Sequence, residues 1–181
     1  GFNNFKNNYR LYRDYLLKRP ETAELVKVLD SLEVEHHSVV LSKLVEEGRI
    51  KPSRSLDYVV TFHDPCYLGR WNGIYEQPRQ VIRASGLRIR EMPRNRSRSF
   101  CCGGGGGQLF YEIKKGERIA TLRAEEASRT LGEGGRRVVA VACPYCNTMF
   151  RAEAGKFNFE VKDVAELLRE AVEQPSSGGP S

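Results

Sequence analysis

The sequence predicts an α/β domain with a Rossmann-like parallel sheet, preceded by a helical extension. Two observations predict this fold. Short apolar runs rich in valine, typical of buried strands, alternate with longer helical stretches. The two clearest runs, residues 56–62 and 137–142, are each followed closely by a cysteine. Because parallel strands joined by right-handed crossovers end at one edge of a sheet, we expect cysteine-bearing loops to meet at the carboxyl ends of the strands.

Residues 1–50 are predicted to form the helical extension. Residues 1–19 are polar and rich in tyrosine and asparagine, with weak periodicity. Pro20 is a favoured first residue of a helix, and apolar residues then recur at three-residue steps as far as Leu32. A second helix is predicted at residues 38–47, where Gly48 ends it. We interpret this stretch as a helical linker.

Residues 51–174 are predicted to form the main domain. A turn at 51–53 opens it, and Gly86 and Pro93 end two of its elements. Residues 175–181, rich in proline, serine and glycine, are predicted to be a disordered tail. The predicted elements are a strand at 56–62, a helix at 76–85, a strand at 87–92, a helix at 117–131, a strand at 137–142 and a helix at 161–172.

Composition narrows the function classes. The net charge of +6 is spread along the chain without a recognition helix or an RNA-stacking motif, so we expect no nucleic-acid partner. No apolar run approaches the length of about 20 residues that spans a bilayer. The densest basic stretch favours either a nearby anionic centre or a solvated loop, and it contains Arg88, Arg90, Arg94, Arg96 and Arg98.

The cysteines form one ordered set, with the spacing C-x34-C-C-x40-C-x-x-C and no cysteine outside it. Such sparse usage in a chain without a signal-peptide stretch favours metal or redox chemistry in a reducing, cytoplasmic setting. Neighbouring side chains diverge, so Cys101 and Cys102 suit a large multi-iron cluster better than one ion. Two alternatives remain: a structural zinc module that mediates assembly, and a thiol–disulfide oxidoreductase that uses Cys143 and Cys146.

Five glycines follow the cysteine pair directly. Backbone without side chains can lie close to a cluster and direct N–H groups at its sulfur atoms, which makes Gly103, Gly104 and Gly105 candidate cofactor-binding residues. The alternative is a flexible linker. His63 is a weaker candidate that hydrogen-bonds a sulfur, caps the loop or binds metal. We expect Asp64 to shape the turn that presents Cys66, and His36 and His37 to be structural; no catalytic residue stands out.

The cysteine spacing resembles that of a known family. It is similar to the CCG, or cysteine-rich, domain of heterodisulfide reductases and related Fe–S oxidoreductases. The similarity extends over residues 34–172 and points to the membrane-associated branch that links electron-transferring flavoprotein to quinone. The segments that carry it are HDPCYLGR at residues 63–70, NGIY at 72–75, EMPRNR at 91–96, CCG at 101–103 and ACPYC at 142–146.

This resemblance implies an oxidoreductase domain that relays electrons between a flavoprotein or ferredoxin-type donor and quinone or a disulfide. The cofactor it implies is a [4Fe–4S]-type cluster, which has a non-cubane arrangement in heterodisulfide reductases. Implied partners are other Fe–S and flavoprotein subunits, and any contact with the cytoplasmic membrane face would come through upstream segments or a partner. Members usually carry two motifs, so residues 1–50 resemble the end of a preceding CCG repeat. The implied ligands are Cys66, Cys101, Cys102, Cys143 and Cys146.

Overall fold

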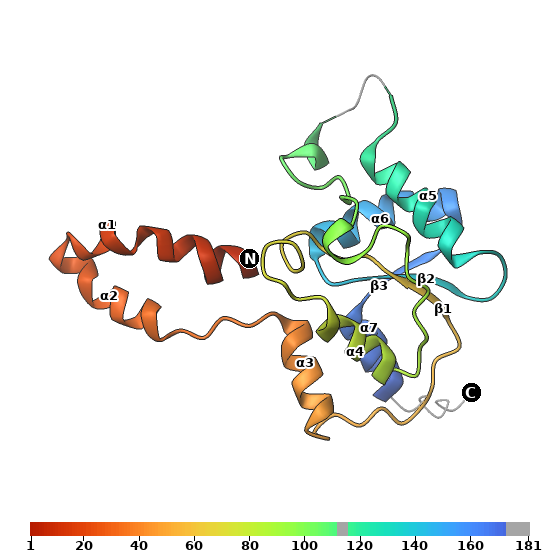
Figure 1. Ribbon diagram of the computed structural model, residues 1–181, viewed down its shortest axis with the longest axis horizontal. Helices are drawn as coiled ribbons and strands as arrows, with labels where there is room; N and C mark the ends of the chain where they lie inside the picture. The colour runs from red at the N-terminus through yellow and green to blue at the C-terminus, as the bar shows by residue number, and fades with distance from the viewer. Residues whose placement is uncertain (112–115, 173–181) are drawn as a thin grey trace, which may run out of the picture.

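The computed structural model describes residues 1–111 and 116–172, and a parallel sheet forms its centre (Figure 1). Its three strands within these residues are β1 (Val59–Phe62), β2 (Arg137–Val141) and β3 (Glu160–Asp163), in that order across the sheet. In the register, Val60 lies opposite Val138, and Val139 opposite Val161. The predicted parallel α/β fold is therefore confirmed.

Helices surround this sheet and connect its strands. Short helical turns also occur, at η1 (Asn4–Asn8), η2 (Tyr9–Tyr12), η3 (Arg96–Arg98) and η4 (Gln108–Phe110). The α-helices of the described residues are α1 (Arg13–Leu17), α2 (Pro20–Ser31), α3 (His37–Glu46), α4 (Glu76–Ala84), α5 (Ile119–Leu131), α6 (Pro144–Phe157) and α7 (Val164–Val172).

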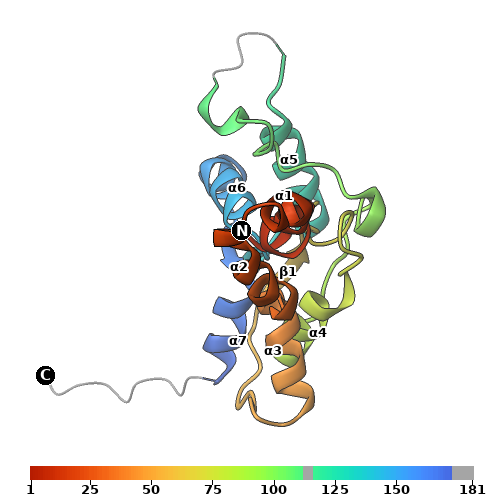
Figure 2. The ribbon, with the colours of Figure 1, turned by 90° about the vertical axis from the view of Figure 1, so that its left-hand side faces the viewer.

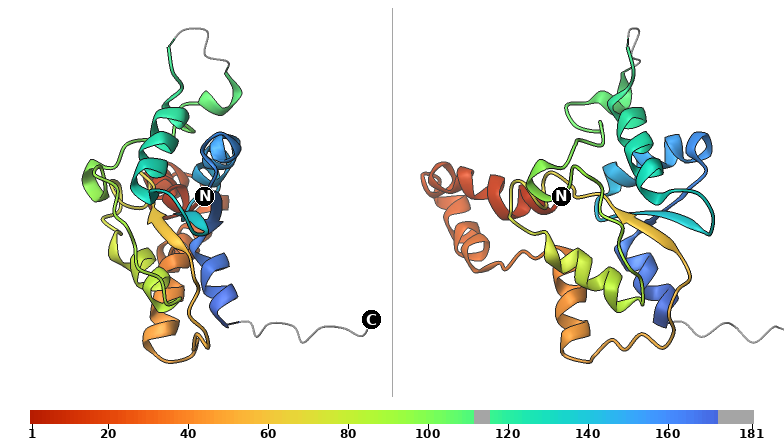
Figure 3. Two further views of the ribbon diagram at one scale, coloured as in Figure 1. Left: turned by 90° about the vertical axis from the view of Figure 1, so that its right-hand side faces the viewer. Right: turned by 45° about the vertical axis from the view of Figure 1, so that its right-hand side comes forward.

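Two hydrophobic cores lie on the two faces of the sheet. In β2, Val138 and Ala140 pack into a core with α4, α7 and part of α3, whereas Val139 and Val141 pack into a core with α5 and α6. Successive side chains of a strand point to opposite faces, so this near-continuous apolar strand serves both cores. Figure 1 shows α5 and α6 above the sheet and α4 and α7 below it, and Figure 3 shows the same separation.

The N-terminal segments form an arm that extends away from the sheet. α1 and α2 lie side by side, and an ion pair with an N···O distance of 2.8 Å joins Arg13 to Asp30 (Figure 2). At the base of the arm, the Asn72 amide bonds with Asn3 and Asn7, both at 3.0 Å. The predicted helical extension is thus present, and it rests on the domain through these polar contacts and through Phe2, which packs against the core on the α4 and α7 side of the sheet.

The strand predicted at residues 87–92 was wrong. Ile89 forms one isolated parallel bridge with Val60, for which the Arg90 N–H donates to the Val60 carbonyl at 2.8 Å. The Arg90 carbonyl then accepts from the Thr61 hydroxyl at 2.6 Å. The Thr61 hydroxyl thus takes the place of the backbone N–H that would otherwise donate to this carbonyl. The backbone pairing between β1 and this segment therefore ends after one bridge.

In the main domain, one α-helix and one strand were not predicted. Helix α6 begins at Pro144, with Cys143 as its N-cap, and ends at Asn158, whose φ of +51° is left-handed. Strand β3 occupies residues 160–163, so the helix predicted at 161–172 begins only at Val164. The disorder predicted for residues 175–181 lies outside the described residues. Within those residues, no helix is long and apolar enough to cross a membrane.

His36 should make the stability of the domain sensitive to acid. It caps α3, and its Nδ1 accepts from the Ser38 N–H at 3.2 Å. Burial, and next the charge of His37, lower the pKa of His36 from 6.5 to about 4, although Asp163 opposes this. The unfolded chain therefore binds the extra proton first, so this contribution to stability is complete above pH 6.5 and declines as the pH falls towards 4.

Asparagine at this position keeps a capping oxygen but has no titrating group. We therefore expect His36→Asn to have the same free energy of unfolding as the wild type at about pH 7.5. Between pH 6.5 and about pH 4, its free energy of unfolding should fall less than that of the wild type. Urea unfolding of the cluster-free protein at several pH values measures this. Identical losses in the two proteins would contradict the role given to His36.

Candidate metal centre

Three separate loops bring the cysteines to one edge of the sheet. Cys66 lies in the loop after β1, and Cys101 and Cys102 lie between η3 and the glycine run. Cys143 lies two residues after the end of β2, and Cys146 lies in the first turn of α6. The expectation that cysteine-bearing loops meet at the carboxyl ends of the strands therefore matches the structure.

The five thiols face one another. The Sγ atoms of Cys102 and Cys146 lie 3.4 Å apart, and Cys101 and Cys143 are close enough to shift the pKa of Cys102 and of Cys146, respectively. The Cys66 sulfur is close enough to sense the charges of Cys102 and Cys143. Cys102 and Cys146 are buried, whereas the other three are half-buried, and none forms a disulfide. The cluster of thiols is thus buried on one side and open to solvent on the other.

Backbone N–H groups point at these sulfur atoms. The Gly103 N–H donates to the Cys101 sulfur at 3.2 Å. Cys143 occupies the N-cap of α6, where its side chain accepts no capping hydrogen bond, but the nearby N–H groups of Tyr145 and Cys146 help to lower its pKa. The N-terminus of a helix carries a partial positive charge, which favours a thiolate. Five thiols with such donors fit an anionic, thiolate-bound iron–sulfur cluster.

Two of the thiols, Cys102 and Cys143, are poised to lose protons, whereas the pKa of each of the other three is raised. Hydrogen bonds from the thiols of Cys101 and Cys146 hold the pKa of Cys102 well below its usual range, although burial opposes this. The Cys146 thiol and the two backbone N–H groups lower the pKa of Cys143 to about 6. Burial, followed by the charge of Cys102, raises the pKa of Cys66. Metal ligation requires thiolates, so this site would release its remaining protons on binding metal.

The three candidate glycines differ in their surroundings. Gly103 has a φ of +82°, and a Cβ added there would lie 3.0 Å from the backbone nitrogen of Ala120. A Cβ on Gly104 would lie 3.1 Å from Met149 Cγ and 3.6 Å from Cys102 Sγ, whereas one on Gly105 would meet nothing within 4 Å. Contact with the thiols is therefore closest at Gly103 and Gly104, and the cofactor-binding role of all three stays a prediction.

Gly104→Ala should disturb the thiol cluster, whereas Gly105→Ala should not. The new methyl group at position 104 would crowd Met149 Cγ at 3.1 Å, next to the Cys102 sulfur, and overpacking of this kind costs about 1–3 kcal/mol. We expect lower iron retention after anaerobic reconstitution and a smaller free energy of unfolding for Gly104→Ala alone. Equal iron content in the two variants would show that the close approach at Gly104 is unimportant.

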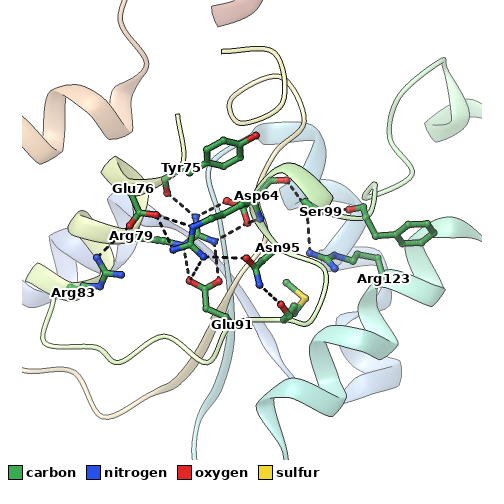
Figure 4. Close-up of polar contacts among 12 residues, drawn as sticks. Asp64, Tyr75, Glu76, Arg79, Arg83, Glu91, Asn95, Ser99 and Arg123 are labelled. Carbon is green, nitrogen blue, oxygen red and sulfur yellow. Dashed lines mark hydrogen bonds and ion pairs between the residues drawn. The ribbon is translucent and has the colours of Figure 1, made fainter. Parts of the chain in front are cut away.

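A buried ion-pair network holds two of the cysteine loops. The Arg79 side chain is fully buried, and its guanidinium bonds to both oxygens of Asp64 at 2.6 and 2.8 Å and to Glu91 at 2.6 and 2.9 Å (Figure 4). Asp64 lies two residues before Cys66 and also accepts the Arg96 N–H at 2.7 Å. This network fixes the loop of Cys66 to the segment that leads to the cysteine pair.

His63 lies beneath the thiols. It is 1% exposed, and its ring interacts with the Cys102 sulfur. A nitrogen of His63 and the sulfurs of Cys102 and Cys146 all lie within 4.8 Å of one another. On the other side of the ring, Arg123 Nε donates to His63 Nδ1 at 3.2 Å. His63 therefore connects the thiol cluster to a buried arginine of α5.

Two arginines of the basic stretch that leads to the cysteine pair form ion pairs with carboxylates. Arg94 bonds to Glu126 at 2.6 Å, and Arg96 bonds to Glu76 at 2.8 Å. The arginine that acts on a thiol is instead Arg70, whose charge favours the Cys66 thiolate. The charges of Arg94 and Arg96 are thus directed at neighbouring elements rather than at the thiols.

Sequence reasoning missed Arg79, Glu91 and Arg123. Arg79 could have been found from the sequence, because it lies among the apolar residues of α4, next to the buried Val81 and Ile82. A charged residue on the apolar face of a helix needs a buried partner. Arg123 carries no such signal, because α5 is rich in both alanine and arginine.

Comparison with known proteins adds to this geometry. The profile of a family described as the cysteine-rich domain, CCG, matches residues 60–151. The chain is 39% identical over 145 residues to the probable iron-sulfur-binding oxidoreductase FadF of Bacillus subtilis. It is 38% identical over 149 residues to EtfAB:quinone oxidoreductase of Syntrophomonas wolfei. It is 37% identical over 143 residues to one of the subunits of the dihydromethanophenazine:CoB–CoM heterodisulfide reductase of Methanosarcina acetivorans.

These similarities include most of this chain but only part of each relative. They cover 77%, 78% and 77% of the chain and 20%, 21% and 34% of the three relatives, respectively. The chain thus spans between a fifth and a third of the length of these proteins. No solved structure matches it.

Proposed function

Because the chain belongs to the cysteine-rich CCG domain family of iron–sulfur oxidoreductases, we propose that it holds a [4Fe–4S]-type cluster and relays electrons through it. The observation that carries this proposal is the meeting of five thiols from three loops, together with the Gly103 N–H donor to Cys101 and the place of Cys143 at the N-terminus of α6. The proposed ligands are Cys66, Cys101, Cys102, Cys143 and Cys146.

The number and placement of the thiols favour a cluster over a single zinc ion. Zinc takes four ligands in a closed tetrahedron, whereas five thiols meet here. A zinc alternative does have one observation in its favour, the buried group of His63, Cys102 and Cys146. With one further cysteine as the fourth ligand, that arrangement would leave two thiols free. A cluster of several irons can use all five, including adjacent cysteines whose side chains diverge, and it can take the non-cubane form.

The partly open side of the site supports electron relay. When bound, a cluster of this type accepts and returns one electron at a time. Cys66, Cys101 and Cys143 are half-buried, so a donor or acceptor can approach within electron-transfer distance of their sulfur atoms. The buried Cys102 and Cys146, with the N–H donors, tune the potential through hydrogen bonds and the exclusion of water.

Relatives suggest where the electrons come from and go. One is named EtfAB:quinone oxidoreductase, one is part of a heterodisulfide reductase, and another, from Chromohalobacter salexigens, is named a probable membrane-anchored ferredoxin. We propose a flavoprotein or ferredoxin-type donor and a quinone or disulfide acceptor. We also propose a place at the cytoplasmic membrane face, reached through another segment or a partner protein.

Anaerobic purification with iron, sulfide and zinc analysis tests the cofactor. We expect a brown protein with several irons and acid-labile sulfide per chain. A colourless protein with one zinc would establish the zinc module instead, and disulfide exchange by metal-free protein would establish a thiol–disulfide enzyme. For the relay, the reduced protein should be reoxidised by a water-soluble quinone or a small disulfide, which stopped-flow absorbance measures. A cluster that neither compound reoxidises would contradict the proposed acceptors.

A further inference from the structure

A buried histidine and a buried arginine form a pair behind the thiol cluster. His63 follows β1 directly, and Arg123 lies in the middle of α5. They are 1% and 0% exposed. Arg123 Nε donates to His63 Nδ1 at 3.2 Å. Neither residue is needed to connect the cysteine loops, because the network around Arg79 does that.

Arg123 is held in a fixed orientation. Its Nη1 bonds to Glu126 at 2.9 Å, and its Nη2 approaches the Ser99 hydroxyl at 3.4 Å. Ser99 in turn donates to the Asp64 carbonyl at 3.0 Å (Figure 4). All three nitrogens of the guanidinium therefore have partners, and the Nε–H remains directed at His63.

The pairing with arginine decides which nitrogen of His63 carries the proton. A guanidinium only donates hydrogen bonds, so Nδ1 must offer its lone pair to Arg123. A neutral imidazole has one N–H, which then lies on Nε2. Phe150 packs against the ring without a polar contact, with its centroid 5.1 Å away in an edge-on arrangement. His63 thus presents an N–H, and no free lone pair, on the side away from Arg123.

The Cys102 sulfur is the acceptor within reach of that N–H. The ring of His63 interacts with this sulfur, and a ring nitrogen lies within 4.8 Å of both Cys102 and Cys146. A metal ligand would need a lone pair, and the lone pair of the ring faces the guanidinium. Donation to sulfur therefore fits the geometry, whereas ligation of iron does not.

We propose that His63 is a positioning residue that donates its Nε2–H to the Cys102 sulfur, held in this tautomer by Arg123, and that it thereby raises the reduction potential of the bound cluster. The proposal rests on the cluster proposed above. Reduction adds negative charge to the cluster and its thiolates, so an N–H donor stabilises the reduced form more than the oxidised form.

Redox titration of reconstituted protein, followed by EPR, tests the proposal with three variants. His63→Leu has no donor, His63→Gln keeps an N–H donor, and Phe150→Leu changes the packing of the ring but not its polar contacts. We expect His63→Leu to weaken the one-electron reduction equilibrium about tenfold, a fall in potential of about 59 mV. His63→Gln should restore part of this difference, and Phe150→Leu should stay close to the wild type.

All three variants should keep the iron and sulfide content of the wild type. Loss of iron from His63→Leu with an unchanged circular dichroism spectrum would show that His63 is a ligand and would overturn the proposal. An unchanged potential in His63→Leu would overturn it as well.

A second measurement needs neither a variant nor a cluster. The ¹⁵N chemical shifts of the ring in cluster-free wild-type protein identify the protonated nitrogen. We expect the Nε2–H tautomer, and an Nδ1–H tautomer would overturn the proposal. Failure of the wild type to bind iron and sulfide would instead refute the proposed function, and this tautomer measurement would still report on His63 by itself.

Discussion

Replacing Cys102 by serine is expected to remove most of the iron and sulfide from the protein. Cys102 is buried at the centre of the thiol cluster, where it contacts Cys101, Cys146 and His63. Those contacts hold its pKa low, so it is the thiol best prepared to bind as a thiolate. A serine hydroxyl is a much weaker ligand, because its pKa is far higher and its oxygen is hard. Iron and sulfide analysis after anaerobic reconstitution measures the loss.

Met149→Leu is a matched control for this variant. Like Cys102, Met149 has a sulfur-containing side chain beside Gly104, but its sulfur is a thioether and not a thiol. Exchange of methionine for leucine conserves volume and usually costs less than about 1.5 kcal/mol. We expect this control to keep its cluster. Full iron and sulfide in Cys102→Ser would remove Cys102 from the ligand set.

Arg79→Met is expected to reduce the free energy of unfolding of the cluster-free protein by about 3–5 kcal/mol, the usual cost of breaking a buried ion pair. Burial would lower the pKa of Arg79, but its bonds to Asp64 and Glu91 outweigh this and raise it. Methionine fills a similar volume, so the change leaves the buried Asp64 carboxylate without its main partner. Urea unfolding followed by circular dichroism measures the effect.

Arg83→Met tests whether this cost comes from burial. Arg83 lies one turn further along α4 and pairs with Glu76 at 3.7 Å, but its side chain is 54% exposed. Exposed pairs contribute about 0–1 kcal/mol, so we expect little change. Similar losses for the two variants would mean that the network around Arg79 has no special structural role.

The main elements of the fold could be predicted because their signals are local. β1 and β2 are short valine-rich runs, and Pro20 and Gly86 mark helix ends within one turn. Residues 87–92 have the same kind of pattern, but the Thr61 hydroxyl ends their pairing after one bridge. No local pattern contains that information, because Thr61 lies 29 residues from its partner Arg90.

The missed elements have a different cause. The segment CPYC is equally compatible with a loop and with the first turn of a helix, and the structure begins α6 there. β3 is only four residues long and is followed directly by α7, so its apolar residue Val161 fits the helical pattern of α7 as well. Pairing with β2 decides in favour of a strand, because the backbone of residues 160–163 then forms hydrogen bonds to β2 instead of those of a further helical turn.

The set of thiols and their placement after strands follow from the amino-acid sequence without any structure, because donor identity and strand position are both local properties. Their ligand role stays a prediction until metal is measured. The surroundings of the thiols depend on the tertiary structure, which places the fully buried Arg79 between two carboxylates and Arg123 behind a histidine 60 residues away. Such pairs form only where the folded chain brings distant side chains together. Their strength comes from the exclusion of water, which no short stretch of sequence controls.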